Sequence, residues 1–370
     1  MSHELLKIST PTGRWSGIGP YYAMFPREFA FEVIETYSSI GQNILDPFAG
    51  RATSIYAAAA LQRHGYGIEI NPVGWLYGKV KLNPANKDKL LIRNYKIGEI
   101  AKTISKEELD DLPEFFSYCY TDRVLRYLLA ARKALSWQKS STDGTLMAII
   151  LVHLHGNKES SFSNQMRQGK AMHPDYSIRW WQERSMLPPD IDPVEFMINR
   201  IKWRYAKGIP EIEKSKIILG DSTSKLKELN KKVRTRQIEP FDLLFTSPPY
   251  YKITNYYYDQ WLRLWMLGNS DKPTWTGEKW KGKFESMVDY QSLLTDVFQG
   301  CAQVMADNAT IYVRTDARKF TLETTKNILS STFPQKSVKI IDSPFTKETQ
   351  TALYGDKEVK PGEVDIIMSS

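Results

Sequence analysis

The chain has 370 residues, of which 42% are hydrophobic and 25% are charged, and its formal net charge is +8. At roughly 150 residues per domain, this length predicts one large domain with an insertion, or two domains, and the composition excludes disordered, coiled-coil and collagen-like chains. The positive charge favours a polyanionic partner. Two cysteines are too few for a disulfide framework, and no apolar run approaches the roughly 18 residues of a membrane span, so we expect a cytoplasmic protein.

The first part of the chain predicts a βαβ unit. Apolar side chains recur at near-helical spacing over residues 28–40, and the apolar pair before Asp46 predicts a buried strand that ends in a turn. A helix with four consecutive alanines follows and ends before Gly65, and residues 66–72 predict a second strand. Strand, turn, helix and strand within about 30 residues imply parallel strands joined by a right-handed crossover.

The same alternation returns after residue 214. Strands are expected at 217–219, 241–246 and 310–314, helices at 224–232, 290–305 and 318–332, and edge strands at 338–341 and 364–368. The fold class is therefore α/β. Between these parts the pattern is mostly helical. We therefore expect a domain formed by residues 1–79 and 214–370, interrupted by an inserted helical region at 80–213.

Three acidic residues follow three of the predicted strands. Asp46 opens the turn Asp-Pro-Phe-Ala-Gly, where Gly50 provides either an unusual backbone conformation or room for a ligand. Glu69 lies 19 residues after Gly50, at the place where the acidic residue of dinucleotide-binding folds accepts hydrogen bonds from ribose. Asp221 could bind an adenine amino group. Each also has a plain structural interpretation: an ordinary βα turn, a solvated strand end, and a helix cap.

The most specific motif is Ser247-Pro248-Pro249-Tyr250, directly after the buried strand at 241–246. Its two prolines fix φ and remove two N–H donors, so the Ser247 and Pro248 carbonyl groups are held as rigid acceptors. Such acceptors suit an exocyclic amine, whose N–H groups need partners while its lone pair attacks. Tyr250 offers a flat face on which an extruded base can stack.

These motifs, in this order, resemble those of the amino-group DNA methyltransferases that use S-adenosylmethionine. The resemblance covers about residues 20–79 and 214–320, somewhat under half of the chain, and implies a Rossmann-like methyltransferase sheet. It implies that Asp46 lies near the methionine amino group, that Glu69 binds the ribose hydroxyls and that Asp221 binds the adenine amine. The other cofactor-binding residues that it implies are Phe48, Ala49, Gly50, Thr246 and Pro26, the last within a segment similar to the family helix that shapes the methionine side of the pocket.

The resemblance assigns catalysis to residues 247–250. Ser247 and the Pro248 carbonyl would hold the target amine on a loop kept rigid by Pro248 and Pro249, and Tyr250 would stack on the base. In this family Ser at the first position goes mostly with cytosine, so N4 of cytosine is favoured over N6 of adenine. RNA or a protein amide as substrate would keep the same chemistry. The family's usual Gly-x-Gly is replaced by Gly50-Arg51-Ala52, which motivates a further hypothesis, a DNA-binding module without turnover.

The order of the motifs resembles the family subclass whose target-recognition region lies between the cofactor half and the catalytic half. We therefore expect double-stranded DNA to be read by residues 80–213. Residue types that contact base edges or phosphates occur there at Ser163, Asn164, Gln165, Arg167 and Gln168, and on a basic helix that includes Arg204. Whether a cognate restriction endonuclease accompanies the protein is left open.

A second basic segment follows the catalytic motif. Lys279, Lys281 and Lys283 surround Trp280, and we expect this loop to contact phosphates, although a solvated charged loop would have the same composition. No metal site is expected, because His153 and His155 have no third ligand near them in the sequence.

Overall fold

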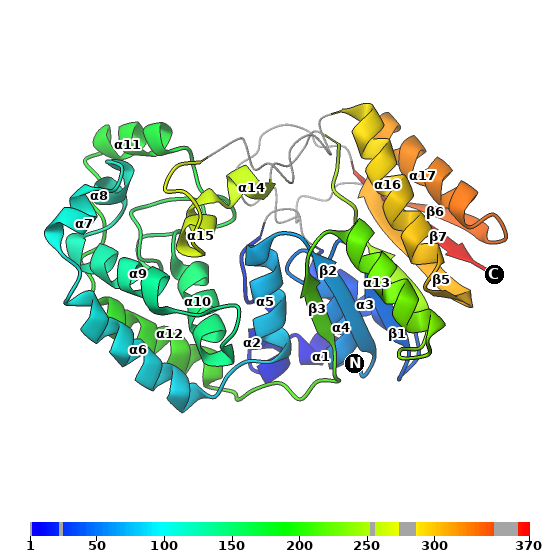
Figure 1. The fold of residues 1–370 in the computed structure, drawn as a ribbon, viewed down its shortest axis with the longest axis horizontal. Helices are drawn as coiled ribbons and strands as arrows, with labels where there is room; N and C mark the ends of the chain where they lie inside the picture. Colours follow the sequence, from blue (N-terminus) through cyan, green and yellow to red (C-terminus); the bar gives the residue numbers. More distant parts are fainter. Residues whose placement is uncertain (1, 22–24, 252–255, 274–285, 344–361) are drawn as a thin grey trace.

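The computed structural model of the chain describes residues 2–21, 25–251, 256–273, 286–343 and 362–370. Seven strands form one sheet in the order β3-β2-β1-β4-β5-β7-β6 (Figure 1). In chain order they are β1 Asn43–Asp46, β2 His64–Glu69, β3 Lys216–Leu219, β4 Phe241–Thr246, β5 Met305–Asp316, β6 Ser337–Ser343 and β7 Glu363–Ser369. The pairs from β3 to β5 are parallel, and β7 is antiparallel to both β5 and β6. This confirms the predicted α/β class and the Rossmann-like sheet.

The strands lie close to the residues that the sequence predicts, with three differences. β2 spans His64–Glu69 and not the expected 66–72, because Asn71 caps α5 and Pro72 begins it. β5 is longer than the expected 310–314, because it begins at Met305. The expectation that 364–368 form an edge strand is wrong, because β7 pairs with β5 on one side and with β6 on the other. The edge is β6, where Val338 and Ile340 are each 41% exposed.

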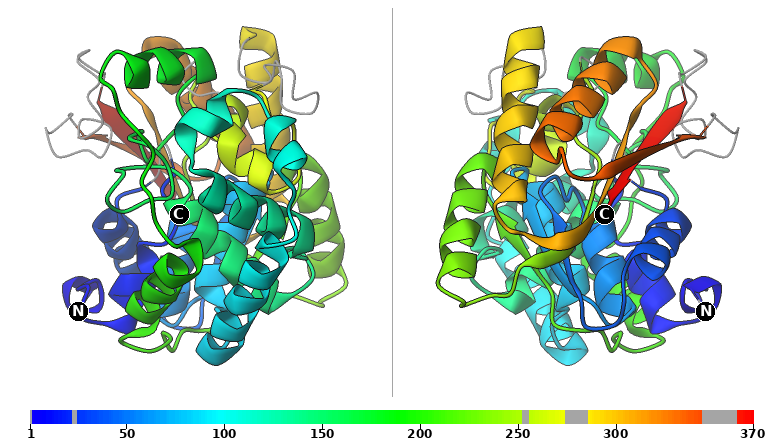
Figure 2. Two further views of the ribbon diagram at one scale, coloured as in Figure 1. Left: turned by 90° about the vertical axis from the view of Figure 1, so that its left-hand side faces the viewer. Right: turned by 90° about the vertical axis from the view of Figure 1, so that its right-hand side faces the viewer.

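Helices cover both faces of the sheet (Figures 1 and 2). One face carries α3 Arg27–Tyr37, α4 Thr53–Ala60 and α5 Pro72–Leu82, and the other carries α13 Ser222–Arg234, α16 Met287–Ala302 and α17 Lys319–Thr332. Ile44 and Leu243 pack in the apolar cluster of the first face, whereas Leu45 and Leu244 pack in that of the second. Consecutive side chains of a strand point to opposite faces, so strands with apolar residues throughout are buried on both sides.

Local sequence signals set the helix starts. Asn71 caps α5 by accepting the N–H of Val73 at 2.9 Å, and Pro72 takes the first helical position. Ser286 caps α16 by accepting the N–H of Asp289 at 3.3 Å. α4 differs, because its N-cap Ala52 has a left-handed backbone with φ of 59° and no side-chain acceptor. α4 thus begins without a side-chain cap and with a left-handed N-cap residue.

Residues 83–213 form a helical layer beside the sheet (Figure 1). Its helices are α6 Lys87–Ala101, α7 Lys106–Asp110, α8 Phe115–Cys119, α9 Asp122–Ala134, α10 Ser141–His153, α11 Pro174–Gln182 and α12 Pro193–Tyr205. His153 ends α10, so the pair His153 and His155 does not lie on a strand. Instead His155 is fully buried, with its Nδ1 2.8 Å from the Arg167 carbonyl oxygen.

Two short helices after the catalytic motif pack on the helical layer. They are α14 Tyr256–Asp259 and α15 Trp261–Met266. The Trp265 ring lies 4.6 Å from that of Phe116, and the buried Arg263 donates to the carbonyl groups of Leu151 at 3.0 Å and Gln168 at 2.7 Å. The helical layer therefore includes residues from both sides of the catalytic motif.

The amino-terminal segment joins the sheet to the helical layer. It contains α1 Ser2–Leu5 and α2 Pro11–Ser16, and the buried Trp15 packs edge-on against Tyr205 of α12, with ring centroids 5.1 Å apart. No helix in the described ranges has the length and the apolar character that crossing a membrane requires.

Candidate active site

The three predicted cofactor-binding carboxylates lie at one edge of the sheet. Asp46 ends β1, Glu69 ends β2 and Asp221 follows β3 closely. These strands are parallel neighbours, so their carboxyl ends meet at the same edge. β4 lies on the other side of β1 and leads into Ser247. The fold therefore brings the predicted cofactor motifs and the predicted catalytic motif side by side.

Asp46 is 1% exposed and is hydrogen-bonded through both carboxylate oxygens. Oδ1 accepts the N–H of Phe48 at 3.0 Å and the hydroxyl of Thr246 at 2.6 Å, and Oδ2 accepts the hydroxyl of Ser54. Burial raises the pKa of Asp46 to about 6. Thr246 is completely buried and donates to Asp46, and its contact with the cofactor stays a proposal.

Glu69 is 8% exposed and holds the turn after β1. Its Oε2 accepts the N–H of Gly50 at 2.7 Å, and its Oε1 accepts the N–H of Asn71 at 2.7 Å. Burial raises the pKa of Glu69 to about 8, and the nearby charge of Asp46 adds to this shift. The interpretation of Glu69 as a solvated strand end is wrong, because the side chain is buried against the turn.

The turn at 48–50 packs closely against α5. Gly50 has φ of +53°, and the nearest atom to a Cβ built on it would be 3.8 Å away, so the backbone conformation and not lack of space favours glycine. A Cβ on Gly74 of α5 would lie 2.7 Å from the Gly50 carbonyl oxygen. Ala49 is 6% exposed and donates its N–H to the Ile68 carbonyl at 3.0 Å, while Phe48 is half-buried.

Arg51, the departure from Gly-x-Gly, is turned toward the amino-terminal segment. It is 4% exposed, and its guanidinium donates to the Gly19 carbonyl at 3.0 Å and to the Thr53 hydroxyl at 3.3 Å. Ala52 takes the left-handed conformation that glycine usually takes. The arginine in this loop thus has a structural role that connects the turn to Gly19.

Asp221 caps the helix that follows it. Its Oδ1 accepts the N–H of Thr223 at 2.9 Å, at the start of α13. The plain structural interpretation, a helix cap, is therefore correct for this residue. The side chain is half-buried at the same edge as Glu69, so the contact with adenine stays a proposal.

The catalytic motif combines two buried prolines with two half-buried polar residues. Pro248 and Pro249 are buried, and Ser247 and Tyr250 are partly exposed. The Ser247 hydroxyl donates to the Tyr250 hydroxyl at 3.4 Å, which in turn donates to Oε1 of Glu363 at 3.2 Å. The motif therefore contacts β7, 113 positions along the chain.

Glu363 belongs to a charged group that the sequence analysis missed. Arg314 of β5 lies opposite Asp365 of β7 and binds it through two contacts of 2.7 Å, and its Nη1 lies 3.2 Å from Oε2 of Glu363. Arg314 is 7% exposed, and its Cζ lies 3.4 Å from the ring centroid of Phe29. Charged residues stand at alternate positions of two strands, namely Arg314 and Asp316 in β5 and Glu363 and Asp365 in β7. This pattern was the sequence signal that could have indicated the charged group.

The segment around Pro26 packs on the end of β4. Pro26 is exposed and stands at the N-cap of α3, between two aromatic residues. The Phe25 ring stacks on Phe245 with centroids 4.6 Å apart, and Phe29 contacts the same ring edge-on at 5.9 Å. Pro26 therefore lies close to the residues that lead into Ser247.

The predicted nucleic-acid contacts differ in exposure. Arg167 is exposed. Arg204 is 6% exposed, donates to the Arg14 carbonyl and lies 5.0 Å from the Trp203 ring, so its predicted phosphate contact is wrong. Ser163 and Asn164 are completely buried and bond within the helical layer, so they cannot read base edges. Lys279, Lys281 and Lys283 lie outside the described residues.

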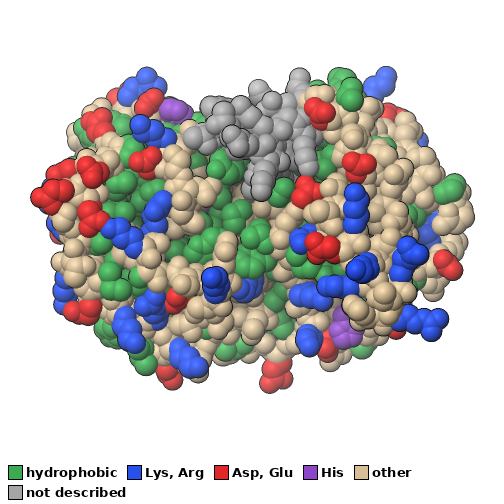
Figure 3. Space-filling model, viewed as in Figure 1, with side chains coloured by type: hydrophobic (Ala, Val, Ile, Leu, Met, Phe, Trp, Pro, Cys, Tyr) green, Lys and Arg blue, Asp and Glu red, His purple; other side chains and the backbone are tan. Residues whose placement is uncertain are grey.

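The surface between the sheet and the helical layer is apolar in its middle (Figure 3). Lys and Arg side chains lie on both sides of this region in the same view, mixed with acidic ones. Among the described residues, no group of three His, Cys, Asp or Glu side chains could hold a metal ion.

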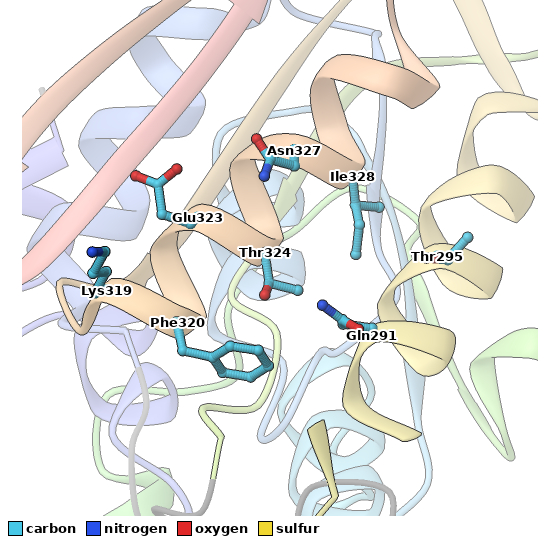
Figure 4. Close-up of a pocket in the computed structure, with 8 residues that line it drawn as sticks. All are labelled: Gln291, Thr295, Lys319, Phe320, Glu323, Thr324, Asn327 and Ile328. Carbon is cyan, nitrogen blue, oxygen red and sulfur yellow. The ribbon is translucent and has the colours of Figure 1, made fainter. Parts of the chain in front are cut away.

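A separate cavity of about 730 Å³ lies between α16 and α17 (Figure 4). Gln291 of α16 points toward Phe320 and Thr324 of α17. Phe320 contacts Tyr251, the residue after Tyr250, with ring centroids 4.9 Å apart. The cavity contains none of the predicted site residues, although it adjoins the catalytic loop through this aromatic contact.

Comparison with known proteins agrees with this geometry. Residues 4–73, which include the turn at 46–50 and Glu69, match the model of the family described as DNA methylase, N6_N4_Mtase. Over this segment the chain is similar to the amino-group DNA methylases. The resemblance inferred from the motifs is thereby confirmed.

Two curated proteins from Methanocaldococcus jannaschii are similar to parts of this chain. The chain is 36% identical over 76 residues to the type II methyltransferase M.MjaI, and 27% identical over 128 residues to the type II methyltransferase M.MjaII. These matches cover 20% and 32% of this chain and only 22% and 24% of the two relatives. The similarity is therefore confined to part of each protein.

Solved structures are similar at a lower level. The rRNA methyltransferase aviRa from Streptomyces viridochromogenes is 11% identical, with a TM-score of 0.36 over 100% of this chain and 93% of that one. A SAM-dependent methyltransferase from Agrobacterium tumefaciens is 9% identical, with a TM-score of 0.38 over 94% of this chain and 63% of that one. Scores of this size carry no information on the substrate.

Proposed function

We propose that the protein transfers a methyl group from S-adenosylmethionine to the exocyclic amino group of a base flipped out of double-stranded DNA, with N4 of cytosine as the preferred target. The observation that carries this proposal is the hydrogen bond of 2.6 Å between Thr246 and Asp46. It fixes the Ser-Pro-Pro-Tyr loop directly beside the turn at 46–50. A methyl donor at the turn and an amine at the loop would then be neighbours.

The residues at the sheet edge fit S-adenosylmethionine. Carboxylates follow three adjacent parallel strands, and the acceptor oxygens of Glu69 and Asp221 suit the ribose hydroxyls and the adenine amine of this cofactor. The N-cap of α4 is Ala52, which has no side-chain acceptor, so the first-turn amides of α4 are suited to an anionic group such as the methionine carboxylate. Bound S-adenosylmethionine supplies an electrophilic methyl group on a sulfonium.

The catalytic loop supplies hydrogen-bond acceptors and a stacking surface. Pro248 and Pro249 are buried, so the backbone that presents the Ser247 and Pro248 carbonyl groups is rigid. Acceptors fixed on both sides of an exocyclic amine favour a pyramidal nitrogen, which the attack on the methyl group requires. Tyr250 is half-buried and can present its ring to an extruded base.

The preference for cytosine rests on Ser247, and DNA as the substrate rests on the family. Transfer of labelled methyl from S-adenosylmethionine to DNA, followed by mass spectrometry of the nucleosides, tests both. We expect N4-methylcytosine. N6-methyladenine would keep the enzyme and overturn the role given to Ser247, whereas label in RNA and not in DNA would overturn the substrate. A protein that binds DNA and shows no transfer to any acceptor would be the DNA-binding module without turnover.

A further inference from the structure

We propose that Ser247, Tyr250 and Glu363 form a proton relay that carries the proton of the methylated amine away from the base, with Arg314 holding its terminal carboxylate. This inference rests on the proposed function and adds to it the destination of the leaving proton. A serine at the first position of the motif cannot keep that proton, because its hydroxyl is a far weaker base than a carboxylate. The chain supplies the carboxylate from β7.

The hydrogen bonds of this relay run in one direction, from Ser247 through Tyr250 to Glu363. The Ser247 hydroxyl donates to Tyr250 at 3.4 Å, and the Tyr250 hydroxyl donates to Oε1 of Glu363 at 3.2 Å. Both hydroxyl groups thus donate along the chain toward Glu363. The lone pairs of the Ser247 oxygen are therefore available to accept an N–H of the target amine.

Glu363 is held at the end of this chain by charge. Its Oε2 lies 3.2 Å from Nη1 of Arg314, and Arg314 is itself fixed by two contacts of 2.7 Å to the buried Asp365. The Glu363 side chain is 40% exposed, so a proton that reaches it can exchange with water. Asp316, which is opposite Glu363 in the sheet, is engaged with the N–H of Arg318 at 2.7 Å. Glu363 is thus the carboxylate that the Tyr250 hydroxyl contacts.

The proposed step moves one methyl group to the amine and one proton to solvent. The amine nitrogen forms a bond to the methyl carbon as the sulfur–carbon bond breaks, and the nitrogen gains the positive charge that the sulfonium loses. One N–H proton then passes to the Ser247 oxygen while the Ser247 proton moves to Tyr250 and the Tyr250 proton moves to Glu363. Glu363 ends protonated and returns the proton to solvent. Because it acts through Tyr250, Glu363 is a positioning and proton-accepting residue that does not touch the base.

The test compares Glu363→Gln, Tyr250→Phe and their combination in single-turnover methyl transfer to DNA. Each single variant should lower the rate constant by about 100-fold, the usual range for loss of a proton acceptor. The double variant should be no slower than either single one, because both break the same chain. Kd for cofactor and for DNA should stay within about twofold of the wild type. The control is Glu323→Gln, an exposed carboxylate on α17 whose loss should leave the rate unchanged.

A solvent isotope effect separates the relay from a merely structural role. The wild type should be slower in D₂O, and this effect should shrink in Glu363→Gln and be restored in part in Glu363→Asp. A wild-type rate in Tyr250→Phe, or losses that multiply in the double variant, would overturn the relay and leave the methyltransferase intact. Absence of methyl transfer by the wild type would instead overturn the proposed function, and the relay with it.

Discussion

The carboxylate of Glu69, at the end of β2, accepts the backbone N–H of Gly50, 19 positions earlier in the chain, at a distance of 2.7 Å. The contact closes the turn after β1 onto the neighbouring strand. Burial raises the pKa of Glu69 to about 8, so the shape of the turn depends on a group that titrates near neutral pH. The same carboxylate is the one proposed to bind the ribose of the cofactor.

Replacing Glu69 by Ala should raise the cofactor Kd. Loss of hydrogen bonds to a buried carboxylate corresponds to about 1.5–3 kcal/mol, or roughly 10- to 150-fold in Kd. Calorimetry with S-adenosylmethionine measures this change, and binding to DNA should be little affected. Glu228→Ala, which removes an exposed carboxylate of α13, is the matched control and should change neither. Equal losses for cofactor and DNA would show that Glu69 only maintains the fold.

The stability of the protein should depend on pH through Glu69. A carboxyl group whose pKa rises from 4.5 to about 8 on folding binds its proton more tightly in the native state. Its contribution to stability is therefore fully present below about pH 4.5 and is lost as pH rises through 8. Denaturant unfolding at several pH values should show a smaller decrease between pH 5 and 8 for Glu69→Gln than for the wild type. An identical pH dependence in the two proteins would contradict the assignment.

The bond between Thr246 and Asp46 should contribute to stability. Thr246→Val keeps the shape of the side chain but removes a donor to a buried carboxylate, so it should lower the unfolding free energy by about 1–3 kcal/mol. Thr325→Val is the control, because the hydroxyl of this buried residue donates only to the Thr321 carbonyl at 2.8 Å, within the helix α17, and its loss should have a smaller effect. Equal decreases of the unfolding free energy for the two changes would show that the hydrogen bond from Thr246 to Asp46 makes no special contribution to stability.

The ring of Tyr250 should contribute to the binding of the extruded base. Tyr250→Ala should weaken the interaction with an extruded base by about 1–3 kcal/mol, the value typical of a base stacked on an aromatic side chain. Methyl transfer at saturating cofactor and varied DNA concentration measures the loss. Tyr250→Phe keeps the ring and should retain the stacking while losing the relay to Glu363. Unchanged turnover in Tyr250→Ala would remove Tyr250 from the active site.

Arg167 and Arg204 should behave differently in DNA binding. Arg167 is exposed, and its replacement by Ala should reduce the slope of log Kd against log salt concentration by about 1 if it contacts a phosphate. Arg204 is buried against Trp203, so Arg204→Ala should lower the melting temperature and leave that slope unchanged. The reverse result would place Arg204, and not Arg167, on the DNA.

The sequence by itself determined the α/β class, the positions of the strands and the order of the motifs. These features depend on short-range patterns, namely apolar runs for buried strands and glycine or proline at turns. β4 lies at the predicted residues 241–246, and the acidic residues at 46, 69 and 221 lie at one sheet edge because parallel strands place their carboxyl ends together.

Only the tertiary structure decided which polar residues are free to act. Arg204 and Asn164 have the residue types of nucleic-acid contacts, yet packing buries them, and local sequence carries no record of that packing. The contact between Tyr250 and Glu363 joins residues 113 positions apart. It exists because β7 inserts between β5 and β6, a pairing that depends on long-range strand order and not on the pattern of either segment.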